Sequence, residues 1–197
     1  VLMHGSAAHS ASRVFAQDML PLLSLAKANS FAEAEGQLQV RNFAYLSLEQ
    51  FCPALNSMIH LRNLMGLRSP VHTLVRLVNP LNAPYSIQGI FHPGYRPVHQ
   101  EAALLLKQAH MTVIKGEGGE TERNPDMQCL AQSVHAGELS EEIWPALFPR
   151  RHVKPKILEP EQLIQLWRGE INDEFAEASI IGTTAVALKL MAKAESR

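Results

Sequence analysis

The sequence predicts an α/β fold in which a central, mostly parallel sheet is flanked by helices. Short apolar segments, typical of buried strands, alternate with segments whose apolar residues recur every three or four positions, as on one helix face. Strands separated by helices are typical of parallel sheets, because a parallel pair needs a long crossover connection. The chain has 197 residues, 46% of them hydrophobic, which supports a sizeable core. We therefore predict one α/β domain over residues 1–197.

The first part of the chain predicts two strands and three helices. Pro21 is expected to kink the first helix, and Gly66 stands where a helix would end. The expected elements are a strand at Val1–Gly5, a helix at Ser12–Ala28, a loop at Phe31–Gly36, a strand at Asn42–Leu48, a helix at Leu48–Met65 and a helix at Pro70–Val78.

The second part predicts three more strands and three more helices, with a proline-rich basic segment between them. That segment, Pro145–Pro160, is expected to be irregular. The expected elements are strands at Ser86–Phe91, Met111–Lys115 and Gln128–His135, and helices at Pro97–His110, Glu161–Trp167 and Asp173–Lys193.

Charge and cysteine content narrow the possible classes of protein. The chain has 18 Lys and Arg against 19 Asp and Glu, so nucleic-acid binding would require a local basic patch. Cys52 and Cys129 are isolated, which is typical of a reduced, cytoplasmic protein rather than a disulfide scaffold. No apolar run reaches the roughly 18 residues of a membrane span. We expect a cytoplasmic protein with no membrane partner.

A glycine-rich acidic loop, KGEGGETERNPD, follows the strand predicted at Met111–Lys115. Gly116, Gly118 and Gly119 allow tight turns and let backbone N–H groups approach a phosphate. Carboxylates of this loop suit a hard cation such as magnesium, and its cations suit phosphate. A solvated turn between strands explains the same composition. The candidate metal ligands are Glu120 and Glu122, and the candidate phosphate ligands are Lys115 and Arg123.

Two further groups of basic residues are candidates for binding phosphate or a carboxylate acceptor. Arg62, Arg68 and Arg76 lie on two predicted helical segments around Gly66, where they could equally cap helix ends. The tract at 150–156 gathers four cations. Pro149 and Pro155 hold it extended, and an extended chain exposes the cations to a polyanion. Such a tract is also typical of solvated surface. Its cations are Arg150, Arg151, Lys154 and Lys156.

The order of motifs along residues 61–126 resembles that of a known enzyme family. It reads LRNLMGLRSPVHTLVRLVNPLNAP, YSIQGIFHPGY and MTVIKGEGGETERNPD. The catalytic domain of the anthranilate phosphoribosyltransferases has a GxR-T turn, an NPL turn, a strand ending in HP and a Gly-Asp-Glu loop in that order. KGEGGETERNPD itself is similar to a divergent group of anthranilate phosphoribosyltransferase-like proteins that bind nucleic acid. The resemblance implies the fold of the nucleoside phosphorylase/phosphoribosyltransferase catalytic domain.

The resemblance also assigns roles to individual positions. Glu120 falls on the Asp of the magnesium-binding pair of the enzymes, and Thr121 falls on its Glu. Arg62 matches the arginine that contacts the aromatic acceptor, and Arg68 matches a second arginine of that turn. His4 and Gly5 match a phosphate-lining turn of the enzymes, although a glycine needed for the turn and an imidazole that caps the backbone explain them too.

Other positions depart from the enzyme pattern. In the opening turn, Met3 and Ser6 replace the Lys and Asn of the enzymes, and no Tyr-His pair precedes Arg62. Because the family carries a helical domain and a first phosphate loop before this region, we expect the natural protein to extend upstream of Val1.

Three hypotheses about function remain. The first is a non-catalytic, sequence-independent DNA or RNA binder, a homodimer by resemblance, with no cofactor. The second is an active glycosyltransferase that moves phosphoribose from phosphoribosyl pyrophosphate to an aromatic amine or base, with magnesium. The third is a structural fragment whose activity lies upstream. The lost donor and metal positions favour the first.

Overall fold

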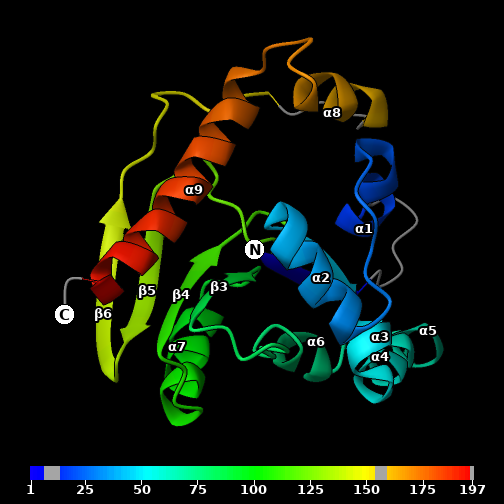
Figure 1. The fold of residues 1–197 in the computed structure, drawn as a ribbon. Coiled ribbons are helices and arrows are strands. Elements are labelled where there is room, and N and C mark those ends of the chain that lie inside the picture. Colours follow the sequence, from blue (N-terminus) through cyan, green and yellow to red (C-terminus); the bar gives the residue numbers. More distant parts are fainter. Residues whose placement is uncertain (7–13, 154–158, 196–197) are drawn as a thin grey trace. The chain divides into compact units, whose positions relative to one another are not determined.

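The computed structural model describes residues 1–6, 14–153 and 159–195. The chain divides into two compact units (Figure 1). Unit 1 comprises Val1–Leu81 and Lys156–Ile171, and unit 2 comprises Asn82–Pro155 and Asn172–Arg197. Each unit has its own sheet, so the α/β class with sheets flanked by helices is confirmed.

Unit 1 contains a two-stranded parallel sheet with helices around it. Strand β1 pairs with β2 from Leu2 opposite Ala44 to Gly5 opposite Ser47. Small buried residues, Ala28, Ala34 and Ala44, pack with Leu46 and let the helices approach the sheet closely. The elements are β1 Leu2–Gly5, α1 Ala16–Met19, the 3-10 helix η1 Leu20–Leu23, α2 Phe31–Arg41, β2 Ala44–Ser47, α3 Leu48–Phe51, α4 Pro53–His60, α5 Arg62–Met65, α6 Val71–Leu74 and α8 Pro160–Trp167.

Helix α2 corrects the prediction of a loop at Phe31–Gly36. Ser30 Oγ accepts the backbone N–H of Glu33 at 3.1 Å, which caps the first turn. In return, Glu33 Oε2 accepts the backbone N–H of Asn29 at 2.9 Å. This reciprocal cap begins the helix. Gly36 lies inside the helix, and packing does not require glycine there, because a Cβ at that position would meet nothing within 4 Å.

Three other helical predictions of unit 1 change in their bounds. Within the described residues, the helix predicted at Ser12–Ala28 is limited to α1 and η1, and Ser24, with a positive φ of 59°, ends η1. The helix predicted at Leu48–Met65 is divided into α3, α4 and α5, because Pro53 has no N–H to continue α3 and instead begins α4. The helix predicted at Pro70–Val78 is limited to α6.

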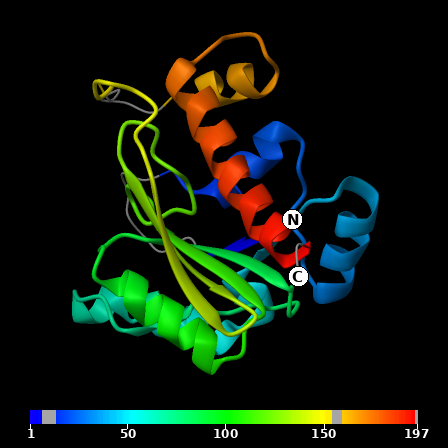
Figure 2. The same ribbon diagram turned by 90° about the vertical axis from the view of Figure 1, so that its left-hand side faces the viewer.

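Unit 2 is a four-stranded sheet in the order β3-β4-β5-β6, with one helix on each face (Figure 2). Helix α7 covers the face with Ile90, Met111 and Val113, and α9 covers the face with Ile114 and Ala131. The alternation of Val113 and Ile114 between the two cores is the two-residue period of a strand. The elements are β3 Tyr85–Ile90, α7 Tyr95–Leu105, β4 His110–Lys115, β5 Cys129–His135, β6 Glu138–Trp144 and α9 Glu174–Glu195.

Strand β6 was not predicted, and it adds an antiparallel pair to the sheet of unit 2. It forms an antiparallel hairpin with β5 through Ala136 and Gly137, which have positive φ values of 50° and 86°. Strands β4 and β5 are also antiparallel, whereas β1–β2 and β3–β4 are parallel. The described strand pairs are therefore evenly mixed, and the expectation of a mostly parallel sheet is too strong.

Candidate functional site

Three arginines gather around one histidine in unit 1. Arg62 begins α5, Arg68 follows its end, and Arg76 follows α6. Gly66, with φ of +70°, ends α5 in the left-handed conformation and turns the chain toward Arg68. Burial lowers the pKa of His72, and a hydrogen bond to the Ser69 backbone opposes this shift. The positive charges of Arg68, Arg62 and Arg76 lower the pKa further. We call these four residues, Arg62, Arg68, His72 and Arg76, the basic cluster.

The basic cluster presents positive charge to solvent. Arg68 is exposed, and Arg62 and Arg76 are half-buried. His72 Nδ1 lies 3.2 Å from the Ser69 carbonyl oxygen, while its Nε2 is buried without a hydrogen-bond partner in the described part of the chain. The structure therefore brings together the three arginines that the sequence proposed. It adds His72, which the sequence signalled by the four-residue spacing of positions 68, 72 and 76.

The opening turn after β1 is built mainly by packing. The His4 ring meets the Phe51 ring edge-on at 5.5 Å between centroids, and Ser6 Oγ donates to Asn56 Oδ1 at 3.1 Å. Burial lowers the pKa of His4, although a hydrogen bond to the Val78 backbone opposes the shift. A neutral imidazole offers less to a phosphate than a cation does. The phosphate-lining role of His4 and Gly5 stays a prediction.

The glycine-rich acidic loop is fixed in place by its own side chain and by two glycines. Glu120 accepts backbone N–H groups at both oxygens, from Glu117 at 2.5 Å and from Gly118 at 2.7 Å. A Cβ on Gly89 would lie 2.2 Å from the backbone oxygen of Glu120, and one on Gly116 would lie 2.0 Å from it. The loop therefore lies directly against the ends of β3 and β4, where only glycine fits.

The carboxylates of this loop do not make a well-formed magnesium site. Both oxygens of Glu120 are already engaged by backbone donors, and the next position is Thr121. Partial burial raises the pKa of Glu122, and the negative charge of Glu120 raises it further. A hydrogen bond with the Ser179 side chain lowers this pKa but does not cancel the rise. In the residues that the structure describes, no three His, Cys, Asp or Glu side chains gather as metal ligands.

Arg123 is a structural residue, which corrects its prediction as a phosphate ligand. It is only 4% exposed, and its Nη2 donates to the Pro145 carbonyl at 2.7 Å. Its guanidinium stacks on Trp144 at 4.9 Å from the ring centroid, and its backbone N–H donates to Thr183 Oγ1 of α9 at 2.9 Å. An arginine enclosed in this way joins α9 to the sheet, and its 4% exposure leaves little surface for a ligand.

The other predicted cations occupy different places. Lys115, half-buried at the end of β4, lies 6.0 Å from the Phe91 ring centroid. Arg150 and Arg151 are exposed in unit 2, next to His152, which is bonded to Asp126. Lys154 and Lys156 lie outside the described residues. Within unit 2, Lys115 therefore lies at the end of β4, whereas Arg150 and Arg151 follow β6.

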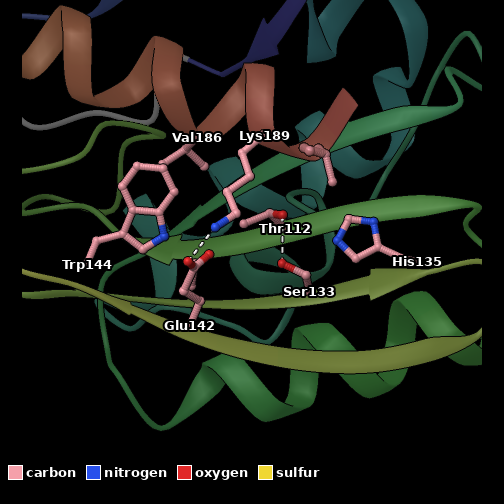
Figure 3. Close-up of a pocket in the computed structure, with 9 residues that line it drawn as sticks. Thr112, Ser133, His135, Glu142, Trp144, Val186 and Lys189 are labelled. Carbon is pink, nitrogen blue, oxygen red and sulfur yellow. Dashed lines mark hydrogen bonds and ion pairs between the residues drawn. The ribbon is translucent and has the colours of Figure 1, made fainter. Parts of the chain in front are cut away.

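A polar cavity under α9 was not predicted from the sequence (Figure 3). Thr112 and Ser133 share a hydrogen bond of 2.8 Å on the sheet, and Lys189 of α9 pairs with Glu142. The cavity measures about 20 Å³, which is room for one water molecule. It suits a bridging water better than a substrate.

The relatives of this chain point to one family of proteins. No family model matches the chain. The anthranilate phosphoribosyltransferase of Novosphingobium aromaticivorans is 31% identical over 140 residues, 71% of this chain and 42% of that protein. The enzyme of the same name from Paraburkholderia phymatum is 30% identical over 107 residues, 54% of this chain and 31% of that protein. The chain thus spans less than half the length of these relatives.

The solved structures agree on the fold. The anthranilate phosphoribosyltransferase of Thermus thermophilus superposes with a TM-score of 0.76 at 22% identity, over 98% of this chain and 58% of that one. A Saccharomyces cerevisiae anthranilate phosphoribosyltransferase variant with Mg bound superposes with a TM-score of 0.68 at 15% identity, over 96% of this chain and 54% of that one. Among the described residues, no helix combines the length and hydrophobicity needed to span a bilayer. The curated homologues and structural neighbours of this chain are anthranilate phosphoribosyltransferases, and the chain belongs to their family and matches the later part of such a protein.

Proposed function

We propose that this protein binds nucleic acid through phosphate groups, without reading base sequence and without transferring phosphoribose. The observation that carries the proposal is the convergence of Arg62, Arg68 and Arg76 on His72. Guanidinium groups match phosphate oxygens with paired N–H donors, and their charge attracts any polyanion. Phosphate contacts fix a protein on a nucleic acid but carry no base information.

The degraded donor and metal positions support binding over transfer. Met3 replaces the cation that the resemblance places in the opening turn, and Thr121 replaces one of two metal-holding carboxylates. The remaining carboxylate, on Glu120, bonds to the loop backbone at both oxygens. Each of these two segments has therefore lost a group that would help to hold a triply charged donor.

The similarity to anthranilate phosphoribosyltransferases supports a second candidate function. This is transfer of phosphoribose from phosphoribosyl pyrophosphate to an aromatic amine or base. Arg62 would then hold the acceptor, and magnesium, if bound at Glu120 and Glu122, would neutralise the pyrophosphate. A homodimer also remains a proposal from the family resemblance.

The first experiment is a fluorescence-anisotropy titration of the full chain with labelled single- and double-stranded DNA of several sequences at two salt concentrations. A triple variant, Arg62→Gln with Arg68→Gln and Arg76→Gln, removes the basic cluster. Its matched control is Arg168→Gln, an exposed arginine of unit 1 whose guanidinium lies 3.9 Å from Glu170. Each phosphate contact contributes roughly −0.9 to the slope of log affinity against log salt on duplex DNA.

We expect sequence-independent binding that weakens with salt, and a slope that falls by about two to three in the triple variant. The control should keep the slope of the unchanged protein. Equal slopes in all three proteins, or no binding at low salt, would contradict the proposal. A parallel assay with phosphoribosyl pyrophosphate, Mg²⁺ and anthranilate should give no product, and product formation would establish the second candidate instead.

A further inference from the structure

Unit 2 contains a small cavity beside the glycine-rich acidic loop, lined on two sides by cations. Arg96 comes from the first turn of α7, and Lys115 comes from the end of β4. Glu117 and Asn124 of the loop and the segment 127–130 after it supply the remaining wall. The two cations therefore approach one space from a helix and a strand that are separate in sequence.

The Arg96 side chain is incompletely satisfied in this position. Its Nε is buried, with no hydrogen-bond partner in the described part of the chain. Because Nε itself has almost no accessible surface, an anion in the cavity would be held by the terminal guanidinium nitrogens of Arg96 rather than by Nε. Arg96 is also close enough to Cys129, another lining residue, for its charge to oppose the rise that burial causes in the thiol pKa.

Two amides complete the donor set. Asn124 Oδ1 already accepts the backbone N–H of Asp126 at 2.9 Å, so the amide nitrogen of Asn124 is the part left to donate. Gln128 is exposed and lines the same cavity. Guanidinium, ammonium and amide donors around one space are the groups that proteins use to hold phosphate oxygens.

Size and charge favour a single phosphoryl group. The cavity measures about 40 Å³, which is room for about three water molecules, and three is the number of terminal oxygens on a phosphate ester. Arg96 and Lys115 provide two positive charges, and Glu117, an exposed lining residue, provides one negative charge. The net positive charge suits an anion, and Glu117 limits the affinity.

We propose that the cavity between Arg96, Lys115 and Gln128 binds a phosphoryl group, either of free phosphate or of a phosphate ester. This site lies within unit 2 and uses none of the basic cluster. It therefore does not depend on nucleic-acid binding by unit 1. An ester would place its three terminal oxygens in the cavity and its bridging oxygen toward solvent.

The test is a calorimetric titration of the full chain at constant ionic strength with three probes. These are inorganic phosphate, a short 5′-phosphorylated oligonucleotide, and the same oligonucleotide with a 5′-hydroxyl. The variants are Arg96→Gln, Lys115→Gln and Glu117→Gln. Lys107→Gln, which removes an exposed charge just after α7, is the matched control. Thermal unfolding of each variant establishes that it is folded.

We expect saturable binding that Arg96→Gln weakens by roughly tenfold or more and Lys115→Gln by about threefold or more. Glu117→Gln should strengthen it about two- to fivefold by removing a like charge, and the control should leave it unchanged. Preference for the 5′-phosphorylated over the 5′-hydroxyl oligonucleotide would identify an ester as the ligand, and binding of inorganic phosphate alone would identify free phosphate.

Absence of saturable binding for all probes would overturn the inference, as would equal affinity in Arg96→Gln, Lys115→Gln and the control. If Arg96→Gln does not fold, Glu117→Gln still tests the inference. An unchanged affinity of Glu117→Gln for phosphate would show that the anion binds outside this cavity.

Discussion

His152 is bonded to Asp126 at two points, one through its backbone and one through its ring. The backbone N–H of His152 donates to Asp126 Oδ2 at 2.7 Å, and His152 Nδ1 lies 2.7 Å from Asp126 Oδ1. The Asp126 side chain is 7% exposed and that of His152 is 36% exposed. The His152 ring also meets Phe148 and Phe175 edge-on. This contact fixes the chain immediately after Arg150 and Arg151.

The Asp126–His152 contact predicts a stability change in acid. Burial would raise the pKa of Asp126, but the hydrogen bonds from His152 and the charges of His152 and Arg151 outweigh it and lower the pKa overall. A carboxyl whose pKa is lower in the folded state than in the unfolded state stabilises the fold. For Asp126 this stabilisation is fully present when the pH is above the unfolded-state pKa, here 3.8, and it is lost as the pH falls through the lower pKa of the folded state.

Asp126→Asn should therefore be less stable than the unchanged protein at neutral pH, with a difference that shrinks below about pH 4. Urea unfolding at a series of pH values measures this, with Glu101→Gln, an exposed residue of α7, as control. If the stability difference between Asp126→Asn and the unchanged protein stayed the same from neutral pH to below about pH 4, the charge of Asp126 would not contribute to stability.

Arg123→Ala should destabilise unit 2 strongly. The variant loses the charged hydrogen bond to Pro145 and the stacking on Trp144. We expect a loss of about 2–4 kcal/mol in the free energy of unfolding. Arg68→Gln, at an exposed position of unit 1, should change it by less than about 0.5 kcal/mol. Similar values for the two variants, from urea unfolding, would show that Arg123 is not a structural residue.

Gly89→Ala should be costly, because its Cβ would lie 2.2 Å from the backbone oxygen of Glu120. We expect a loss of about 2 kcal/mol or more, since backbone must move to make room. Gly36→Ala in α2 is the matched control, with nothing within 4 Å of the new methyl group. It should gain about 0.5–1 kcal/mol from helix propensity. A tolerated Gly89→Ala, measured by urea unfolding, would mean that the glycine-rich acidic loop is not held against β3.

Magnesium should have little effect on stability. A divalent cation bound at about 1 mM affinity would add roughly 1.4 kcal/mol at about 10 mM Mg²⁺. Because Glu120 already bonds to the loop backbone, we expect a smaller change than this in thermal unfolding. Glu120→Gln should instead destabilise the loop, by about 1 kcal/mol. A rise in the midpoint with Mg²⁺ that Glu120→Gln abolishes would support the transferase candidate.

Local signals in the sequence located most elements of the fold. Strands β2, β3, β4 and β5 and helices α8 and α9 lie where the apolar patterns predicted them. Helix α2 was missed although Ser30 and Glu33 have the spacing of a capping box. Strand β6 was missed because it is an edge strand rich in acidic residues, and the Ala-Gly turn before it was not read as a hairpin.

The sequence by itself determined the α/β class, the motif order that identifies the relatives, and the arginines of the basic cluster, because these depend on residues near one another in the chain. Only the tertiary structure decided which cations are available to a ligand. Arg123 and Arg96 are both arginines close to polar loops, yet packing against α9 buries the first, while the second lines a cavity with Lys115. Burial and shared cavities arise from contacts between distant segments, which local periodicity does not record.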